Sequence, residues 1–171
     1  MARHLDYTIT FDAPAEKIYA DLIRREYWQS LMDAIGFATP HAEITSFSSG
    51  EGGTEIVFSY RVPRSNLPPI ARTVMPVDMV VIREQHFDPY DHELNRATGA
   101  YSASVPRGPV QLGGESLLTE TDTGSQLRFT GVCKVHIPFV GGALEDLILH
   151  HIKQLFDAEE AFAADWIAEH H

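Results

Sequence analysis

The longest run of periodic hydrophobic positions in this chain lies near its C-terminal end. From Leu144 onward, apolar residues recur three and four positions apart, a spacing that gathers them on one face of an α-helix. The residues on this face are Leu144, Leu147, Ile148, His151, Ile152, Leu155, Ala158, Phe162 and Trp166. The pattern predicts a helix from about Pro138 to Trp166, with its charged side in solvent. About 25 helical residues span roughly 37 Å, enough to cross a small domain.

Most of the remaining chain shows the two-residue alternation of β-strands. Residues 4–11 predict a first strand, and two short helices are expected after it, one beginning at Pro14 and one covering about Tyr27 to Ile35. Further strands are expected at residues 37–47, 56–62, 77–87, 92–105, 110–120 and 127–137. This order predicts an α+β fold in which a curved antiparallel sheet wraps around the long C-terminal helix.

The length and continuity of the pattern predict a single domain over residues 1–168. No repeat, low-complexity tract or linker interrupts the 171 residues, which are enough to bury a sizeable core. The terminal residues 169–171 are interpreted as a tail, which is either native or a tag remnant.

Charge and cysteine content narrow the partners and the location. The formal net charge is −11, and a surface this negative repels nucleic acids and anionic membranes. The N-terminal residues lack the apolar stretch of a signal peptide, and no apolar run reaches the length of a membrane span. The single Cys133 excludes an internal disulfide. We therefore expect a cytoplasmic protein with no nucleic-acid partner and no membrane insertion, and the oligomeric state stays open.

Several short motifs carry a resemblance to a known superfamily. They are Tyr27-Trp28, Arg72 through Pro76-Val77-Asp78-Met79, Leu127-Arg128-Phe129-Thr130-Gly131, Ile137-Pro138-Phe139-Val140-Gly141-Gly142 and Trp166-Ile167. With the order of the elements, they make the whole chain resemble the START-like superfamily, also called SRPBCC, which includes Bet v 1 and polyketide cyclases. The resemblance implies a helix-grip fold with a cavity between sheet and final helix, usually for an apolar or amphipathic small molecule. More narrowly, the chain resembles an actinobacterial family within it that is known only as a domain of unknown function, and no catalytic residues carry over from that family.

His151 is the most informative candidate for a ligand contact. By helical phase it lies in the middle of the apolar face, so its ring is expected to be largely buried, to have a lowered pKa and to point at the cavity. There it either orients a ligand oxygen, acts as a general base, or is a core histidine bonded to a carbonyl or a tyrosine hydroxyl.

The other expected cavity residues are mostly apolar. They are Leu144, Leu147 and Leu155 of the helix, and Phe58, Tyr60, Tyr101 and Phe129 of the strands. The small residues from Ala97 to Ala103 leave space opposite the helix. Arg96, Thr98 and Ser102 share one parity of that strand, and they add hydrogen-bonding groups to the cavity only if this parity faces inward. The sequence does not decide the parity.

No metal site and no cofactor is expected. His150 and His151 are neighbours on a helix, so their side chains diverge by about 100° and cannot share an ion. The polar residues of one expected hairpin, interpreted as a solvated turn, are His86, Asp88, Asp91 and His92. Gly141-Gly142 is interpreted as a tight corner between strand and helix rather than an anion site, and Cys133 as a core residue.

Three functions stay open, and with them the question of catalysis. The leading hypothesis is the binding of a lipid-like or polyketide-like small molecule, because no nucleophile–base pair, paired carboxylates or metal cluster is visible. The second is an aromatase- or cyclase-like enzyme in which His151, with Arg96 or a cavity tyrosine, moves protons. The third is a protein-interaction module with a collapsed pocket. The proline-broken segment from Pro63 to Pro76 is expected to be either a gate over the cavity or a fixed cover of the sheet edge.

Overall fold

A computed structural model of the protein describes residues 3–35, 41–73, 77–106 and 108–171. Its strands are β1 (Arg3–Phe11), β2 (Glu43–Gly50), β3 (Gly53–Val62), β4 (Met79–Phe87), β5 (Arg96–Ser104), β6 (Val110–Thr121) and β7 (Gly124–Val135). Its helices are α1 (Ala15–Leu22), α2 (Arg25–Ile35), the 3-10 turn η1 (Arg64–Asn66), α3 (Pro69–Arg72) and α4 (Gly141–His170).

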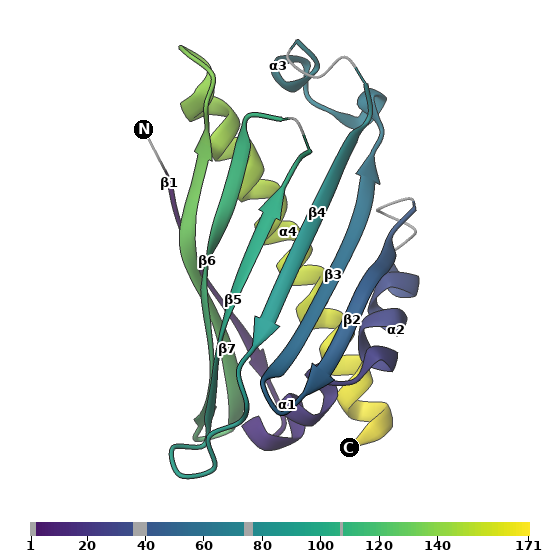
Figure 1. The fold of residues 1–171 in the computed structure, drawn as a ribbon, viewed down its shortest axis with the longest axis vertical. Coiled ribbons are helices and arrows are strands. Elements are labelled where there is room, and N and C mark those ends of the chain that lie inside the picture. The colour runs from purple at the N-terminus through teal and green to yellow at the C-terminus, as the bar shows by residue number, and fades with distance from the viewer. Residues whose placement is uncertain (1–2, 36–40, 74–76, 107) are drawn as a thin grey trace.

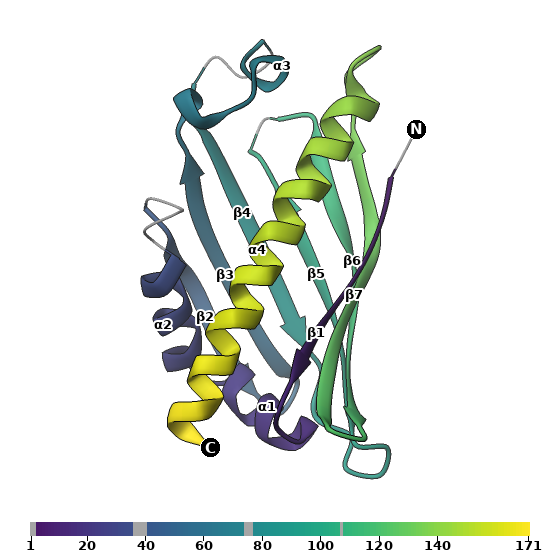
Figure 2. The same ribbon diagram turned by 180° about the vertical axis from the view of Figure 1, so that it is seen from behind.

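The described strands form one seven-stranded antiparallel sheet in the order β1-β7-β6-β5-β4-β3-β2. The strands from β2 to β7 pair with their neighbours in the chain, and β1 returns to pair with β7. α4 crosses one face of this sheet diagonally (Figure 1, Figure 2). α1 and α2 lie near the C-terminal end of α4, whereas α3 lies at the opposite end of the sheet (Figure 1). The predicted helix-grip fold is confirmed.

β5 begins at Arg96, whereas the predicted strand begins at His92. The difference arises because the side chain of Asp91 stabilises a turn over the intervening residues. Its carboxylate accepts hydrogen bonds from the backbone N–H groups of Glu93 and Leu94, over 3.0 and 3.1 Å. A side chain that satisfies backbone donors locally competes with the strand ladder in this way.

α4 begins at Gly141, later than predicted, and runs on to His170. Phe139 has a φ of 70°, and a residue in this left-handed conformation cannot be part of a right-handed helix. The strand expected over residues 37–47 is described from Glu43 onward as β2. Residues 37–40 of that expectation lie outside the described residues.

The buried face of α4 is rotated relative to the predicted one. Its buried residues are Gly141, Leu144, Glu145, Leu149, Ile152, Leu155, Phe156, Glu159, Ala163, Trp166 and Ile167. Leu147, Ile148 and His151, which were expected at the centre of the face, are only partly buried. The difference arises because the buried stripe contains two glutamates, Glu145 and Glu159, which a hydrophobic pattern counts as polar. Neither α4 nor any other described helix is long and apolar enough to cross a lipid bilayer.

The first of these glutamates joins α4 to the end of β7. Glu145 has no exposed surface, and its Oε2 accepts a hydrogen bond of 2.9 Å from the backbone N–H of Val135. The Lys134 Nζ lies 4.0 Å from the same oxygen. The contact satisfies the last N–H of the strand and fixes the first turns of the helix on the sheet.

The second glutamate forms an ion pair with Arg83 of β4 inside the core. Arg83 and Glu159 are only 4% and 7% exposed, and both Nη atoms of the guanidinium donate to the carboxylate. The guanidinium carbon lies 5.1 Å from the ring centres of both Phe58 and Phe156, so rings of β3 and α4 flank the charge. A buried ion pair adds little net stability, but each partner prevents the other from being buried without a counter-charge.

Removal of one partner of this ion pair is expected to destabilise the protein strongly. Glu159→Leu leaves a buried guanidinium unpaired, so the free energy of unfolding should fall by about 3–5 kcal/mol. The double variant Arg83→Met/Glu159→Leu replaces both charges by apolar side chains of similar size, and it should lose far less. Urea unfolding followed by circular dichroism measures the free energy of unfolding of the wild type and of both variants.

Asp6→Asn is the matched control for the loss of a charge pair. Asp6 and Arg128 form an exposed ion pair, with 58% and 51% of their side chains exposed, and such pairs contribute little to stability. If Glu159→Leu is as stable as the double variant, the core pair does not have the role assigned to it.

Candidate functional site

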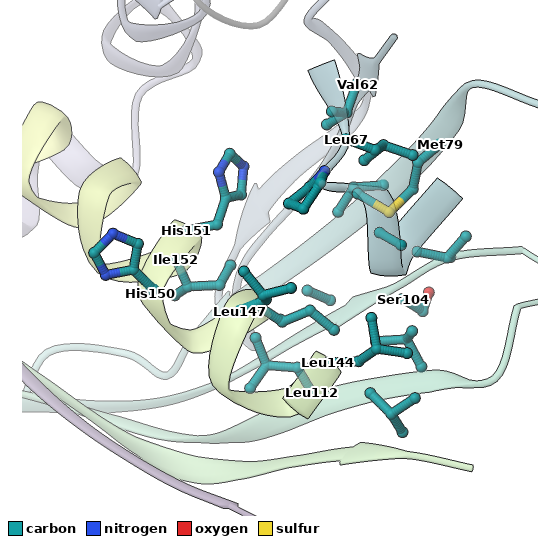
Figure 3. A pocket seen from close by; sticks show the side chains of 18 of the residues that line it. Val62, Leu67, Met79, Ser104, Leu112, Leu144, Leu147, His150, His151 and Ile152 are labelled. Carbon is teal, nitrogen blue, oxygen red and sulfur yellow. The ribbon is translucent and has the colours of Figure 1, made fainter. Parts of the chain in front are cut away.

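A cavity of about 340 Å³ lies between the first half of α4 and the end of the sheet near α3 (Figure 3). The sheet and its strand ends contribute Tyr60, Val62, Met79, Val81, Ala103, Ser104, Val105, Pro109, Val110, Leu112, Val135 and Ile137. α4 contributes Leu144, Leu147, Ile148, His150, His151, Ile152 and Gln154. The wall is mainly apolar with a few polar groups, and the volume falls within the range of about 300–1,000 Å³ for small-molecule sites.

Small side chains on β5 provide part of this space. Ala103 and Ser104, at the end of the strand, line the cavity and fill little volume. Lower on the same strand, Tyr101 is 6% exposed and its ring occupies the interior. The small-residue strand therefore leaves room only at its Ala103 end.

η1 and α3 cover one end of the cavity. Leu67, between these two helices, is buried and lies in the wall. The other wall residues from this segment are Pro63, Asn66, Pro68 and Ala71. The described part of the segment expected to act as a gate thus borders the cavity, and residues 74–76 lie outside the described residues.

His151 brings an imidazole to the cavity wall. Its Nε2 is buried and has no hydrogen-bond partner among the described residues. Burial, and to a lesser extent the charge on His150, lowers the pKa of His151, as expected from the sequence, so the ring is neutral at neutral pH. The ring is partly rather than fully buried. His150 projects in another direction (Figure 3), is exposed, and has its Nε2 3.3 Å from the amide nitrogen of Gln154.

Tyr60 adds a second titratable group to the wall. It is 2% exposed, and burial raises the pKa of its phenol to about 12, while Arg83 lowers and Glu159 raises that pKa to smaller extents. The phenol therefore keeps its proton at neutral pH and can act as a hydrogen-bond donor.

The residues proposed from the sequence separate into two groups. Those that line the cavity are His151, Leu144, Leu147 and Tyr60. Four others, Leu155, Phe58, Tyr101 and Phe129, are buried in the core but lie outside the cavity wall. At their level the side chains pack directly against one another and leave no space for a ligand.

Arg96 and Thr98 lie on the outer face of the sheet, and their placement in the cavity is corrected. The buried residues of β5 are Ala97, Tyr101 and Ala103, so the opposite parity points away from α4. Arg96 and Thr98 are exposed, and the Thr98 hydroxyl donates to the Asp88 carboxylate over 2.7 Å. Ser102 has the same outward parity.

The sequence pattern overlooks Arg83 and Glu159. Arg83 stands in a strand with apolar residues of both parities, which gives no contrast between its two faces. Arg83 shares the parity of Val81, which is buried in the structure, but the sequence does not mark this parity as the inward one. Nothing local marks Glu159, since its burial depends on its distant partner.

The remaining candidate chemistry is structural. The His86 Nε2 lies 3.0 Å from the Asp88 carboxylate within the polar turn. The described residues contain no group of three or more His, Cys, Asp or Glu side chains arranged to hold a metal ion. Cys133 has no exposed surface, and burial, together with the nearby Glu145, raises the pKa of its thiol to about 11. It is therefore a protonated core residue.

A family model described as "Protein of unknown function (DUF2505)" matches residues 6–167. The chain belongs to the DUF2505 family. Relatives of this DUF2505 protein include the uncharacterized proteins Rv0481c of Mycobacterium tuberculosis and Mb0491c of Mycobacterium bovis. Each is 28% identical over 172 residues, a match that covers 98% of both chains.

Solved structures with the same fold include Bet v 1-like proteins. Norcoclaurine synthase from Thalictrum flavum has a TM-score of 0.60 at 16% identity, covering 99% of this chain and 88% of that one. Ara h 8.0201 has a TM-score of 0.56 at 13% identity, covering 95% and 98%. Protein Ms6760 from Mycobacterium smegmatis has a TM-score of 0.60 at 11% identity, covering 98% and 92%. The DUF2505 protein thus has the START-like helix-grip fold.

Protonation of His151 is expected to destabilise the folded protein. Its folded pKa is below the value of about 6.5 for an unfolded chain, so the unfolded state binds more protons between these two values. The free energy of unfolding should therefore fall as the pH drops below about 6.5, and His151→Leu should lack this contribution. NMR titration of the ring protons, assigned with the variant, measures the pKa directly. A value at or above 6.5 would contradict the burial argument.

Proposed function

We propose that this DUF2505 protein binds an apolar or amphipathic small molecule in the cavity between α4 and the sheet. The observation that carries the proposal is an apolar wall of this size that contains the unpartnered Nε2 of His151. Apolar walls supply most of the affinity in such sites, and a few polar groups orient the ligand. The ligand contacts that we assign are Tyr60, Leu144, Leu147 and His151.

Binding without chemistry is favoured over catalysis by the isolation of His151. A histidine that transfers protons with one ring nitrogen is commonly oriented by a polar group bonded to the other, and no hydrogen bond joins His151 to another described residue. An aromatase- or cyclase-like enzyme is the second candidate, supported by a neutral imidazole and a protonated Tyr60 in one wall. The structure of norcoclaurine synthase in complex with dopamine and hydroxybenzaldehyde is also similar in fold, at 16% identity.

A protein-interaction module with a collapsed pocket has less support, because the interior is not filled at the level of the cavity. The single cysteine and the net charge of −11 support a cytoplasmic location and argue against a nucleic-acid partner.

His151→Leu is expected to weaken the binding of a ligand that bonds to the imidazole. The loss should be about 1–3 kcal/mol, the cost of an unmet buried polar partner, which corresponds to a roughly 5- to 150-fold higher Kd. Native mass spectrometry of freshly purified protein identifies a bound molecule, and displacement of a fluorescent fatty acid compares the two proteins.

His92→Leu provides the matched control, because His92 is exposed and lies outside the cavity wall. This variant should bind like the wild type. Unchanged affinity of His151→Leu together with a raised melting temperature would remove His151 from the proposed site.

The segment of η1 and α3 is expected to open when ligand enters or leaves. Its backbone amides, at residues 64–72, should exchange hydrogen faster than those of β5 to β7, and ligand should slow them. Hydrogen exchange with mass spectrometry measures both rates. Exchange as slow as in the central strands and unchanged by ligand would identify the segment as a fixed cover.

A further inference from the structure

The interior of the fold is open toward α3 and filled toward α1, with a sharp boundary between the two. On three neighbouring strands the cavity wall ends at Tyr60, Val81 and Ala103. The next inward residues on these strands are Phe58, Arg83 and Tyr101, which are buried and lie outside the wall. One step of two residues along each strand, about 7 Å, separates open space from packed core.

A continuous layer of side chains forms this boundary, and we call it the partition. Its members are Phe58 of β3, Arg83 of β4, Tyr101 of β5, Phe129 of β7, and Phe156 and Glu159 of α4. All six are less than 9% exposed, so little solvent reaches any side chain of the layer.

Ring and charge contacts join the partition from one side of the interior to the other. The guanidinium of Arg83 lies 5.1 Å from the ring centres of Phe58 and Phe156. Phe156 stacks on Phe129 with ring centres 4.6 Å apart, and Phe129 meets Tyr101 edge-on at 5.2 Å. The sheet and the helix are therefore bridged without a gap at this level.

A small space lies beneath the partition. It has a volume of about 20 Å³ and is lined by residues that include Arg83, Gln85, Phe129 and Glu159. The Gln85 Oε1 is buried and has no partner among the described residues, and the space suffices for about one water molecule. It is far too small for a ligand, so the cavity has no second chamber below its floor.

We propose that the partition, with the Arg83–Glu159 ion pair at its centre, determines the length of the ligand that the cavity accepts. This inference rests on the proposed binding function and adds a specificity determinant to it. The preferred ligand is a compact apolar molecule that ends at the level of Tyr60 and Val81. A longer molecule must leave its excess in solvent, since passage through the floor would separate two buried charges.

Two double variants separate the volume of the partition from its charge. Arg83→Ala/Glu159→Ala removes both charges together, so no unpaired charge is buried, and it opens the floor toward the space below. Arg83→Met/Glu159→Leu removes the same charges but keeps the floor filled. Thermal unfolding of both variants shows whether each is folded at the assay temperature.

A homologous series of n-alcohols, which carry no charged head group, measures the length limit by displacement of a fluorescent fatty acid. In the wild type, affinity should rise about fourfold for each methylene that is buried, and then level off when the chain reaches the floor. In Arg83→Ala/Glu159→Ala the levelling should occur about five methylenes later, the length of two strand residues. In Arg83→Met/Glu159→Leu it should occur where it does in the wild type.

If the affinity levels off at the same alcohol length in Arg83→Ala/Glu159→Ala as in the wild type, the partition does not determine ligand length. An equal shift in both double variants also overturns it, since charge and not volume would then set the limit. If none of the three proteins binds any of the alcohols saturably, the proposed binding function itself is contradicted. This outcome is distinct from the two that overturn the partition. If the alanine variant is unfolded, Phe156→Ala against Phe156→Leu makes the same comparison between an opened and a filled floor.

Discussion

A helix that borders a cavity packs against the sheet along only part of its surface, and this constraint governs the structure. Along its first half α4 buries Leu149 and Ile152 but faces open space beside them, so contacts before and after that stretch help to fix its position. Glu145 bonds to the end of β7, and Glu159 pairs with Arg83 of β4. These two anchors are about 21 Å apart along the helix, one at each end of the cavity. Because both carboxylates are buried, a shift of the helix would leave them without partners, at a cost of several kcal/mol.

The order of the elements was predictable because the sequence pattern of each element is local. Alternation at a period of two and recurrence at three and four residues are properties of short windows of sequence, and they locate strands and helices without knowledge of their partners. The burial of Glu145 and Glu159 is different. Glu159 is buried only because an arginine 76 residues away lies opposite it on the sheet. A pattern that counts carboxylates as polar therefore rotates the predicted face of α4 toward Leu147 and Ile148.

The candidate site was only partly predictable for a related reason. On β5 small and polar residues alternate with little contrast, so nothing in that strand decides whether Ala97 or Thr98 faces the helix. The pairing of β5 with β4 and β6 decides it, since it sets the parity by register. The position of His151 in the cavity wall was predictable, because residue spacing determines which side chains lie near one another on a long helix. How far down the sheet the cavity extends depends on side chains of five different elements that meet in space, which no single stretch of sequence encodes.

Residues of the sheet limit the depth of the cavity as much as residues of α4 do. Gly114 of β6 and Gly131 of β7 are opposite each other in the strand register. A Cβ on Gly131 would lie 2.3 Å from the Gly113 carbonyl oxygen and 2.7 Å from the Tyr101 hydroxyl, closer than real contacts allow, so the missing side chain leaves room for both. This hydroxyl is buried without a partner among the described residues, and burial raises the pKa of the phenol to about 12, so it stays protonated. An unpaired buried hydroxyl is unfavourable by itself. Its position is nevertheless the one that brings the Tyr101 ring edge-on to Phe129 and closes the floor, so the glycine and the tyrosine act as one unit that separates cavity from core.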